Sequence, residues 1–300
     1  MSTPETLESI DVAATPAVAS PAGSSVSVPA PGTANNLALT LTLVRRDLVR
    51  LRRDTGRWVG LVLQPMLLWV LLGSGFGEVF KVPGLPGVDY HLFFFPGLVM
   101  MVSLFTAIFA TMAVIEDRDH GFLQQVLVAP GARWAMVLGK VLGVLSIAMV
   151  QFALIIPAST LAGYSLTAID WPTLVLAFIL GTLGTTSLAF ALAWVSPTTH
   201  AYHAIMGVLL IPLWLISGSM FPLPQDGWLS VVAAINPMTY GLDGLRHGME
   251  GGPSALATTA PATTFVALAI YVVVAFALAT WVSRARRLTR APSAPKGGRS

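Results

Sequence analysis

Hydrophobic residues in this chain gather in six long segments that short polar stretches separate. A helix of about 20 residues, rising ~1.5 Å per residue, crosses a ~30 Å hydrocarbon core, and each segment is long enough to do so. Proline occurs inside the first, third and fifth segments, which membrane helices tolerate when neighbouring groups satisfy the freed backbone. The pattern predicts six transmembrane helices, at residues 58–77, 92–115, 134–163, 172–195, 201–221 and 262–283.

The composition agrees with an all-α membrane protein. Of the 300 residues, 55% are hydrophobic and only 10% are charged, and the mean hydropathy is +0.75. A soluble domain typically carries about 25% charged residues, so much of this surface is expected to face lipid. The absence of cysteine excludes disulfides, thiolate metal sites and cysteine nucleophiles.

The basic residues predict the orientation of the six helices. An even number of spans puts both termini on one side of the membrane. All 17 Lys and Arg except Lys81 and Arg246 fall on that side, either beyond the first and last spans or around the connection between the second and third. Because cytoplasmic loops are enriched in Lys and Arg, we expect a multi-pass plasma-membrane protein with both termini in the cytoplasm.

The two ends of the chain differ from its middle. Residues 1–36 are rich in Ala, Pro, Ser, Thr and Val and carry no basic residue. They lack the basic region and continuous apolar core of a secretory signal, so we expect a disordered cytoplasmic tail. Residues 291–300 predict a second, short flexible tail, which leaves 37–290 as the membrane domain.

A basic amphipathic helix is expected directly before the first span. Apolar residues spaced 4, 3, 4 and 3 apart form one helical face: Leu37, Leu41, Val44, Leu48 and Leu51. Arginines occupy much of the remainder: Arg45, Arg46, Arg50, Arg52 and Arg53. Such a helix lies in the membrane surface among anionic headgroups. The alternative is a cytoplasmic extension of the first span.

A charged stretch at 116–133 separates the second and third apolar segments. It begins with Glu116-Asp117-Arg118-Asp119, and its middle has a short apolar helical face that ends at a proline. On the positive side of the membrane, an amphipathic loop of this kind is suited to receive force from a soluble partner. Its candidate contact residues are Glu116, Arg118, Gly121, Phe122, Leu123, Val126, Leu127, Pro130 and Arg133. The alternative is that Phe122 only anchors the loop in lipid.

The segment 217–261, on the other side, is too apolar for an ordinary loop. The groups Met220-Phe221-Pro222, Trp228-Leu229 and Ile235–Tyr240 predict short helices that dip into the outer leaflet and break at the prolines.

Several kinds of chemistry are missing from the pattern. No Asp or Glu lies well inside a predicted span, which argues against a carrier driven by protons or sodium. Gly139-Lys140 lacks the remaining residues of a phosphate-binding loop, so Lys140 is interpreted as a residue whose amine extends to the membrane surface. His200 and His203 have no further metal ligands nearby. We therefore expect no catalytic residues, no metal and no cofactor on this chain.

Three stretches together match a known family. They are Phe95-Pro96-Gly97-Leu98, the run from Glu116-Asp117-Arg118 through Gly121–Pro130 to Gly139-Lys140, and Asn236-Pro237-Met238-Thr239-Tyr240 with Asp243, Leu245 and Arg246. Because these stretches occur in this order in a chain with six predicted spans, the chain resembles the membrane subunit of type-two ATP-binding-cassette exporters. That family includes drug-resistance and polysaccharide-export permeases, and the resemblance covers about 37–290.

The resemblance implies a division of labour. Two membrane subunits, here a homodimer, form the pathway, and two cytoplasmic ATPases bind ATP and Mg. Residues 116–133 would be the coupling helix seated in the ATPase, and 37–56 the connecting helix beside it. Residues 218–250 would be outer re-entrant helices that gate the exit, with Asn236, Pro237, Tyr240, Asp243 and Arg246 as their marked positions.

The expected function is export of a hydrophobic or amphipathic substrate, because no charged cluster lines the spans for an ion or small polar solute. Nucleic acid is not an expected partner. A scaffold or assembly factor that recruits a cytoplasmic protein is the alternative. An intramembrane protease using Ser217 or Ser219 is a distant third possibility.

Overall fold

The structure is a computed structural model that describes residues 33–53, 55–76, 82, 87–119, 132–224 and 226–285. Its regular elements in these ranges are helices. In chain order they are α1 (Thr33–Arg53), α2 (Thr55–Phe76), α3 (Tyr90–Asp119), α5 (Arg133–Ile155), the 3₁₀ helix η1 (Ile156–Thr160), α6 (Trp171–Val195), α7 (Thr199–Ile205), the π-helical turn η2 (Met206–Leu210), α8 (Ile211–Trp214), the π-helical turn η3 (Leu215–Ser219), α9 (Trp228–Ile235), α10 (Pro237–Met249) and α11 (Pro261–Ala285).

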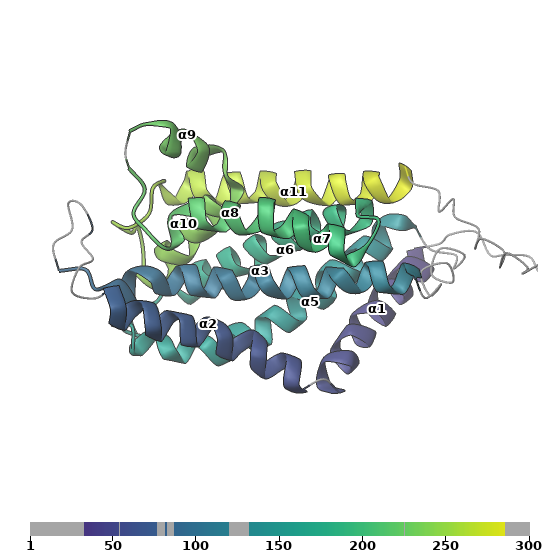
Figure 1. Cartoon of the computed structure of the whole chain (residues 1–300), viewed down its shortest axis with the longest axis horizontal. Helices are drawn as coiled ribbons and strands as arrows, with labels where there is room; N and C mark the ends of the chain where they lie inside the picture. Colours follow the sequence, from purple (N-terminus) through teal and green to yellow (C-terminus); the bar gives the residue numbers. More distant parts are fainter. Residues whose placement is uncertain are drawn as a thin grey trace, which may run out of the picture.

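The long helices lie side by side along one axis, and consecutive helices run in opposite directions (Figure 1). One end of the bundle holds the ends of α3, α6 and α11 and the start of α5. Here α1 crosses the bundle axis at an incline and packs on α5, so we name this the α1 end. The opposite end holds the start of α3 and the short helices α9 and α10, and we name it the α10 end.

Five helices are long and apolar enough to cross a membrane, judged by length and composition over the described residues. They are Tyr90–Arg118, Arg133–Thr160, Trp171–Val195, Thr199–Ser219 and Pro261–Arg284. These coincide with the second to sixth predicted spans. The first prediction, 58–77, coincides with α2, whose described apolar stretch at Val62–Phe76 is shorter than the five candidate spans. The all-helical fold is therefore confirmed, with five candidate spans established by this measure.

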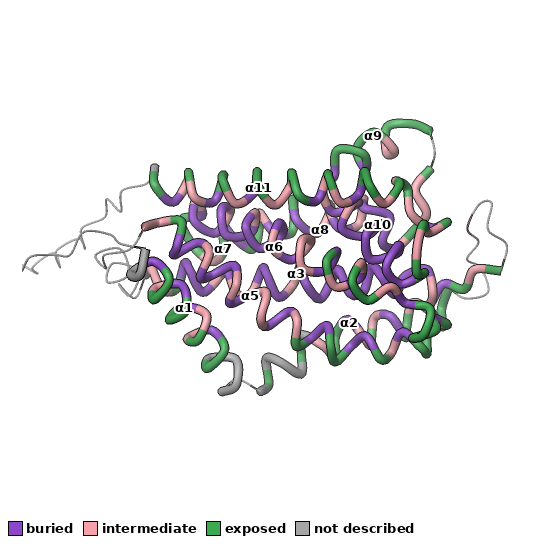
Figure 2. The backbone as a smooth tube through the Cα atoms, turned by 180° about the vertical axis from the view of Figure 1, so that it is seen from behind, coloured by how far each residue is buried: buried purple, intermediate pink, exposed green. Residues whose placement is uncertain are grey.

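The core lies along α3, which is the most deeply buried of the five candidate spans. Phe94, Phe95 and Leu98 are fully enclosed between neighbouring helices. A helix that is apolar all round must be surrounded by other apolar surface. In contrast, α11 and α2 bury one side and expose the other (Figure 2). Their outward leucines, valines and tryptophan suit contact with lipid.

The sequence Phe95-Pro96-Gly97-Leu98 forms a crossing point inside α3. Pro96 has no N–H to offer the carbonyl four residues earlier, and that carbonyl, of Leu92, accepts a hydrogen bond from the Tyr164 hydroxyl at 3.0 Å. Trp214 Nε1 donates to the Gly97 carbonyl at 3.1 Å. A Cβ at Gly97 would lie 2.8 Å from Ser219 Cβ, so only glycine permits this approach.

The predicted boundaries differ slightly from the observed ones. α1 begins at Thr33, four residues before the expected start of the membrane domain at 37. α1 ends at Arg53 and α2 begins at Thr55 with a different direction, so α1 does not continue α2 in a straight line (Figure 1). Of the predicted tails, residues 1–32 and 291–300 lie outside the described residues, as do residues 286–290 at the end of the predicted membrane domain.

Candidate functional site

α1 packs on α5 through a face that the leucine pattern did not identify. Asn36, Thr40, Leu43 and Asp47, spaced 4, 3 and 4 apart, are buried. The Thr40 hydroxyl lies 3.1 Å from the Ala135 carbonyl, to which it donates. The predicted apolar face is exposed instead at its described leucines, Leu37, Leu41 and Leu48. α1 therefore has one face on the protein and a second, apolar face free for lipid.

Two glycines of α5 let α1 approach closely. A Cβ on Gly139 would lie 3.1 Å from Leu43 Cβ, and one on Gly143 would lie 2.9 Å from Asp47 Oδ2. The Gly-x-x-x-Gly spacing puts both glycines on one side of the helix. Neither position has room for a larger side chain unless α1 moves away from α5.

A buried ion pair joins the same two helices. Lys140 Nζ lies 2.9 Å from Asp47 Oδ2, with side chains that are only 8% and 4% exposed. The interpretation of Lys140 as reaching the membrane surface is therefore wrong. Two charges removed from water are tolerated only when each is paired in good geometry. Asp47 provides that pairing and also lies 3.7 Å from Arg46.

Further polar contacts attach both sides of the 120–131 segment to other helices. Before it, Asp117 Oδ2 accepts from Arg46 at 2.7 Å, and Arg118 donates to the carbonyls of Ser196 at 2.8 Å and Pro197 at 3.1 Å. After it, the Ala132 N–H donates to Asn36 Oδ1 at 2.7 Å, and Arg133 donates to the Ser283 carbonyl at 2.8 Å. We call these contacts, with the Asp47–Lys140 pair, the α1-end network.

The predicted coupling and surface-helix residues are only partly within the described chain. Glu116 and Arg45 are exposed, while Arg46, Arg118 and Arg133 belong to the α1-end network. The other predicted coupling and surface-helix residues lie outside the part of the chain whose side chains the structure describes. They are Gly121, Phe122, Leu123, Val126, Leu127, Pro130, Arg50, Arg52 and Arg53. Asn36 and Asp47 are not part of the predicted apolar face, although their helical spacing with Thr40 and Leu43 indicates a second face of α1.

At the opposite end, the Asn236–Tyr240 motif forms the junction between α9 and α10. The Asn236 side chain accepts from the Met238 N–H at 3.0 Å, which caps α10, and donates to the Leu213 carbonyl at 2.5 Å. Pro237 occupies the first turn, where its missing N–H costs nothing. The Tyr240 hydroxyl donates to the Ala234 carbonyl at 2.6 Å. Short helices broken at proline are thus present.

Three side chains of α10 hold the segment 254–259. Asp243 Oδ2 accepts from the N–H and hydroxyl of both Thr258 and Thr259, at 2.7–3.0 Å. Arg246 donates to the carbonyls of Leu256 at 2.8 Å and Gly218 at 2.9 Å.

His247 completes this arrangement. Its Nδ1 accepts from the Ser254 N–H at 3.0 Å, so its Nε2 carries the proton and donates to the Thr259 carbonyl at 2.9 Å. We call Asp243, Arg246 and His247 the α10-end cluster.

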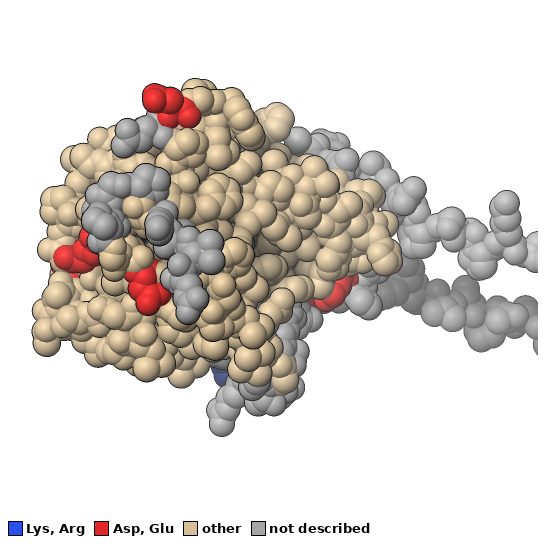
Figure 3. Space-filling model, turned by 60° about the vertical axis from the view of Figure 1, so that its left-hand side comes forward, with Lys and Arg blue, Asp and Glu red and all other residues tan. Residues whose placement is uncertain are grey.

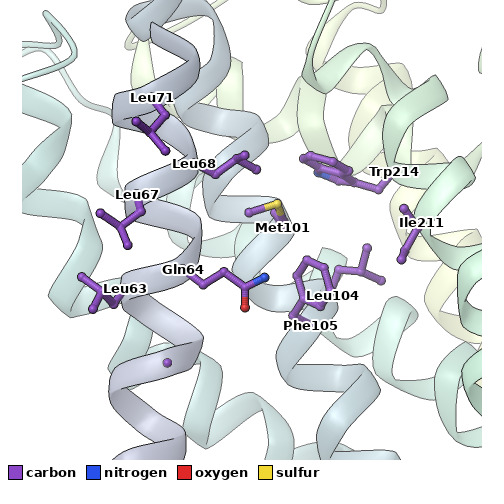
Figure 4. A pocket seen from close by; sticks show the side chains of 11 residues that line it. Leu63, Gln64, Leu67, Leu68, Leu71, Met101, Leu104, Phe105, Ile211 and Trp214 are labelled. Carbon is purple, nitrogen blue, oxygen red and sulfur yellow. The ribbon is translucent and has the colours of Figure 1, made fainter. Parts of the chain in front are cut away.

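Between the two ends, an apolar groove of about 500 Å³ opens on one side of the bundle (Figure 4). Among the described residues that line it, Gln64 has the only amide, and its side chain extends toward α3 between leucines of α2. Trp214 contributes an indole at the far wall. The lining residues are Gly60, Leu63, Gln64, Leu67, Leu68, Leu71, Met101, Leu104, Phe105, Ile211 and Trp214.

Comparison with known proteins identifies the class of membrane protein. Residues 38–249 match the family described as ABC-2 type transporter, so the chain belongs to that family. The match begins in α1 and ends in α10, and therefore contains the α10-end cluster and the α1-end network except Asn36 and Ser283. Members of this family are membrane-spanning subunits of ATP-binding-cassette transporters.

Individual relatives carry names of the same kind. The chain is 28% identical over 210 residues to a "Putative transport permease ycf38" of Cyanophora paradoxa, covering 68% of this chain and 71% of that protein. It is 29% identical over 245 residues to "Nodulation protein J" of Neorhizobium galegae, covering 77% and 87%. It is 28% identical over 167 residues to "Probable multidrug ABC transporter permease YbhR" of Escherichia coli (strain K12), covering 53% and 44%.

Proposed function

We propose that this chain is the membrane subunit of an exporter that a separate ATPase drives, with ATP and Mg bound by that partner. The observation that carries the proposal is the α1-end network, because it attaches α1 to residues on both sides of the 120–131 segment. A force applied to that segment by a soluble protein would reach α1 through Arg46 and Asn36, and α11 through the hydrogen bond from Arg133 to Ser283. The family match supports an ATPase of the ATP-binding-cassette class as the source of the force.

The proposed topology has six spans, with α2 as the first, and both termini in the cytoplasm. Supporting it, α2 has a described apolar stretch at Val62–Phe76, and consecutive long helices alternate in direction. Arg45, Arg118, Arg133 and Arg284 all belong to segments of the α1 end, which favours that end as cytoplasmic. In this orientation α9 and α10 lie at the outer side, where we propose that they gate the exit.

The proposed substrate is hydrophobic or amphipathic. The apolar groove supports this, because a surface of leucines, Phe105 and Trp214 with one amide offers little to a small ion. A second copy of the chain beside the groove would enclose it, so we propose a homodimer with two ATPase subunits.

The test is purification of the tagged full chain from its native host in mild detergent. We expect a stoichiometric soluble ATPase to copurify, and Phe122→Asp to lose it while Phe122→Leu keeps it. Truncating or charging a buried interface anchor typically costs more than ~1–2 kcal/mol of binding free energy. Phe122→Asp should also abolish ATP-dependent export from membrane vesicles without reducing the amount of chain in the membrane.

Two results would overturn the proposal. Normal export by Phe122→Asp would remove the coupling role of the segment. A chain that recruits a cytoplasmic protein but moves no substrate in vesicles with ATP would instead be a scaffold.

A further inference from the structure

A second hollow, of about 850 Å³, lies at the α10 end, and none of its described lining residues also lines the apolar groove. Its walls come from α9, α10, the start of α3 and the segment 255–259, and its volume falls in the range of small-molecule sites. We call it the α10-end cavity. Its lining residues are Val82, Phe93, Pro222, Leu223, Pro224, Ser230, Ala233, Ala234, Thr239, Tyr240, Arg246, Ala255, Leu256, Ala257, Thr258 and Thr259.

The lining combines hydroxyl groups with a single cation. Serine, threonine and tyrosine contribute five hydroxyls, Arg246 is the only charged residue among the described lining, and the remainder is apolar. No carboxylate lines the cavity among the described residues, which disfavours a cationic ligand. Acidic side chains are visible on the face of the molecule that Figure 3 shows, but none is among the described residues that line the cavity.

Arg246 is incompletely neutralised. The residue is 2% exposed, and its guanidinium lies 4.8 Å from the centre of the Phe93 ring. The nearest Asp243 oxygen, Oδ1, is 3.9 Å away, while Oδ2 is occupied by Thr258 and Thr259. Arg246 Nε and the hydroxyl of Thr239, also 2% exposed, make no hydrogen bond with the described residues. A buried cation with a free donor favours an added anionic oxygen.

α9 provides a second, independent observation about the ligand. Ser230, Ala233 and Ala234 form its cavity-facing side. The opposite side presents Trp228, Val231 and Ile235, which are 74%, 59% and 77% exposed. An apolar helical face beside a polar cavity is typical of a surface that meets the boundary between lipid headgroups and acyl chains. A ligand with a polar anionic head and an apolar body could use both sides of α9.

We propose that the α10-end cavity binds the headgroup of an anionic phospholipid, with the phosphate toward Arg246 and Thr239 and the acyl chains along the exposed face of α9. The proposal relies on the membrane location and on the outer position assigned above to α9 and α10, but not on the ATPase or on export. It can therefore hold in a chain whose coupling is lost.

The test measures lipid binding to the purified full chain by calorimetry. The probes are dihexanoyl phosphatidylglycerol, dihexanoyl phosphatidylcholine and glycerol phosphate alone. Both lipids carry the phosphate, but the choline cation of the zwitterionic lipid would meet the cationic Arg246 in a cavity without a carboxylate among its described lining residues. We therefore expect the anionic lipid to bind at least about tenfold more tightly than the zwitterionic lipid. Glycerol phosphate, which has no acyl chains, should bind more weakly than the anionic lipid.

Two tryptophan variants locate the binding. Ala255→Trp fills the cavity from an exposed lining position, whereas Ala262→Trp changes an exposed alanine that does not line it. We expect the first to lose about tenfold or more in affinity for the anionic lipid and the second to match the parent chain. Thr239→Val, which removes the free hydroxyl, should weaken binding by a smaller factor.

The outcomes separate this proposal from the proposed function. Equal affinity for both lipids, or unchanged binding by Ala255→Trp, would overturn it. Glycerol phosphate binding as tightly as the lipid would also overturn it, by assigning the cavity to soluble phosphate compounds. Because Phe122→Asp should bind the anionic lipid normally, failure of export and failure of lipid binding are distinguishable.

Discussion

The two ends of the bundle use buried charges in different ways. At the α1 end, Arg46 pairs with Asp117, 71 positions away, and Asp47 pairs with Lys140, 93 positions away. At the α10 end, Asp243, Arg246 and His247 mainly bind main-chain groups and hydroxyls of one segment that follows 7 to 16 positions later. The first arrangement joins separate helices, and the second stabilises one local structure.

This difference predicts how each end responds to damage. A long-range ion pair stabilises the relative position of two helices, so its loss should change how α1 sits on the bundle. Hydrogen bonds to a neighbouring segment should instead affect only that segment when they are lost. Mutations at the α1 end are therefore expected to affect partner binding, and mutations at the α10 end to affect local opening.

Lys140→Met should have the largest effect. It leaves buried Asp47 with only the longer contact to Arg46, at 3.7 Å, and breaking a buried ion pair typically costs about 3–5 kcal/mol. We expect a clear fall in the melting temperature of the detergent-purified chain and loss of the copurifying ATPase. The double variant Asp47→Asn with Lys140→Met should recover much of the stability, because no unpaired charge remains.

Arg45→Met is the control for removing a cation, since Arg45 is exposed on α1. Surface substitutions usually change stability by no more than about 0.5 kcal/mol. Equal losses for Lys140→Met and Arg45→Met would show that the buried pair has no special role.

Asp243→Asn should have an intermediate effect that stays at its own end. The four hydrogen bonds that the Asp243 carboxylate accepts at Oδ2 would then be made to a neutral amide. We expect this change to lower the free energy of unfolding by about 2–3 kcal/mol. Amide hydrogen exchange should accelerate at Thr258 and Thr259, while the ATPase still copurifies. Asp226→Asn, at an exposed position, is the control and should leave exchange at both threonines unchanged. Loss of the ATPase in Asp243→Asn would contradict the separation of the two ends.

Much of the fold was predictable because hydrophobic segments of this length have few alternatives. The second to sixth predicted spans agree with α3, α5 with η1, α6, α7 to η3, and α11 to within a few residues at most boundaries. The break before Pro237 was also predictable, since a proline that follows a potential cap marks the start of a helix.

The contacts between helices were not predictable from the same pattern. Lys140 and Asp47 occupy positions that each suggest exposure when considered alone, and only their juxtaposition across α1 and α5 makes burial favourable. Likewise, Asp243 and Arg246 were marked by a family resemblance, but their partners, Thr258, Thr259 and Leu256, lie in a segment without any regular pattern. Pairing depends on tertiary packing, which one-dimensional periodicity does not contain.

The smallest effect tests the packing that makes the α1-end pairing possible. In Gly143→Ala the new Cβ would lie 2.9 Å from Asp47 Oδ2, so Asp47 must move away from Lys140, and crowding of this kind costs about 1–2 kcal/mol. Gly181→Ala makes the same chemical change in α6, where nothing lies within 4 Å of the new Cβ. The gain of about 0.5–1 kcal/mol from replacing a helical glycine should then dominate. We therefore expect opposite shifts in melting temperature, whereas equal shifts would mean that α1 is not held tightly against α5.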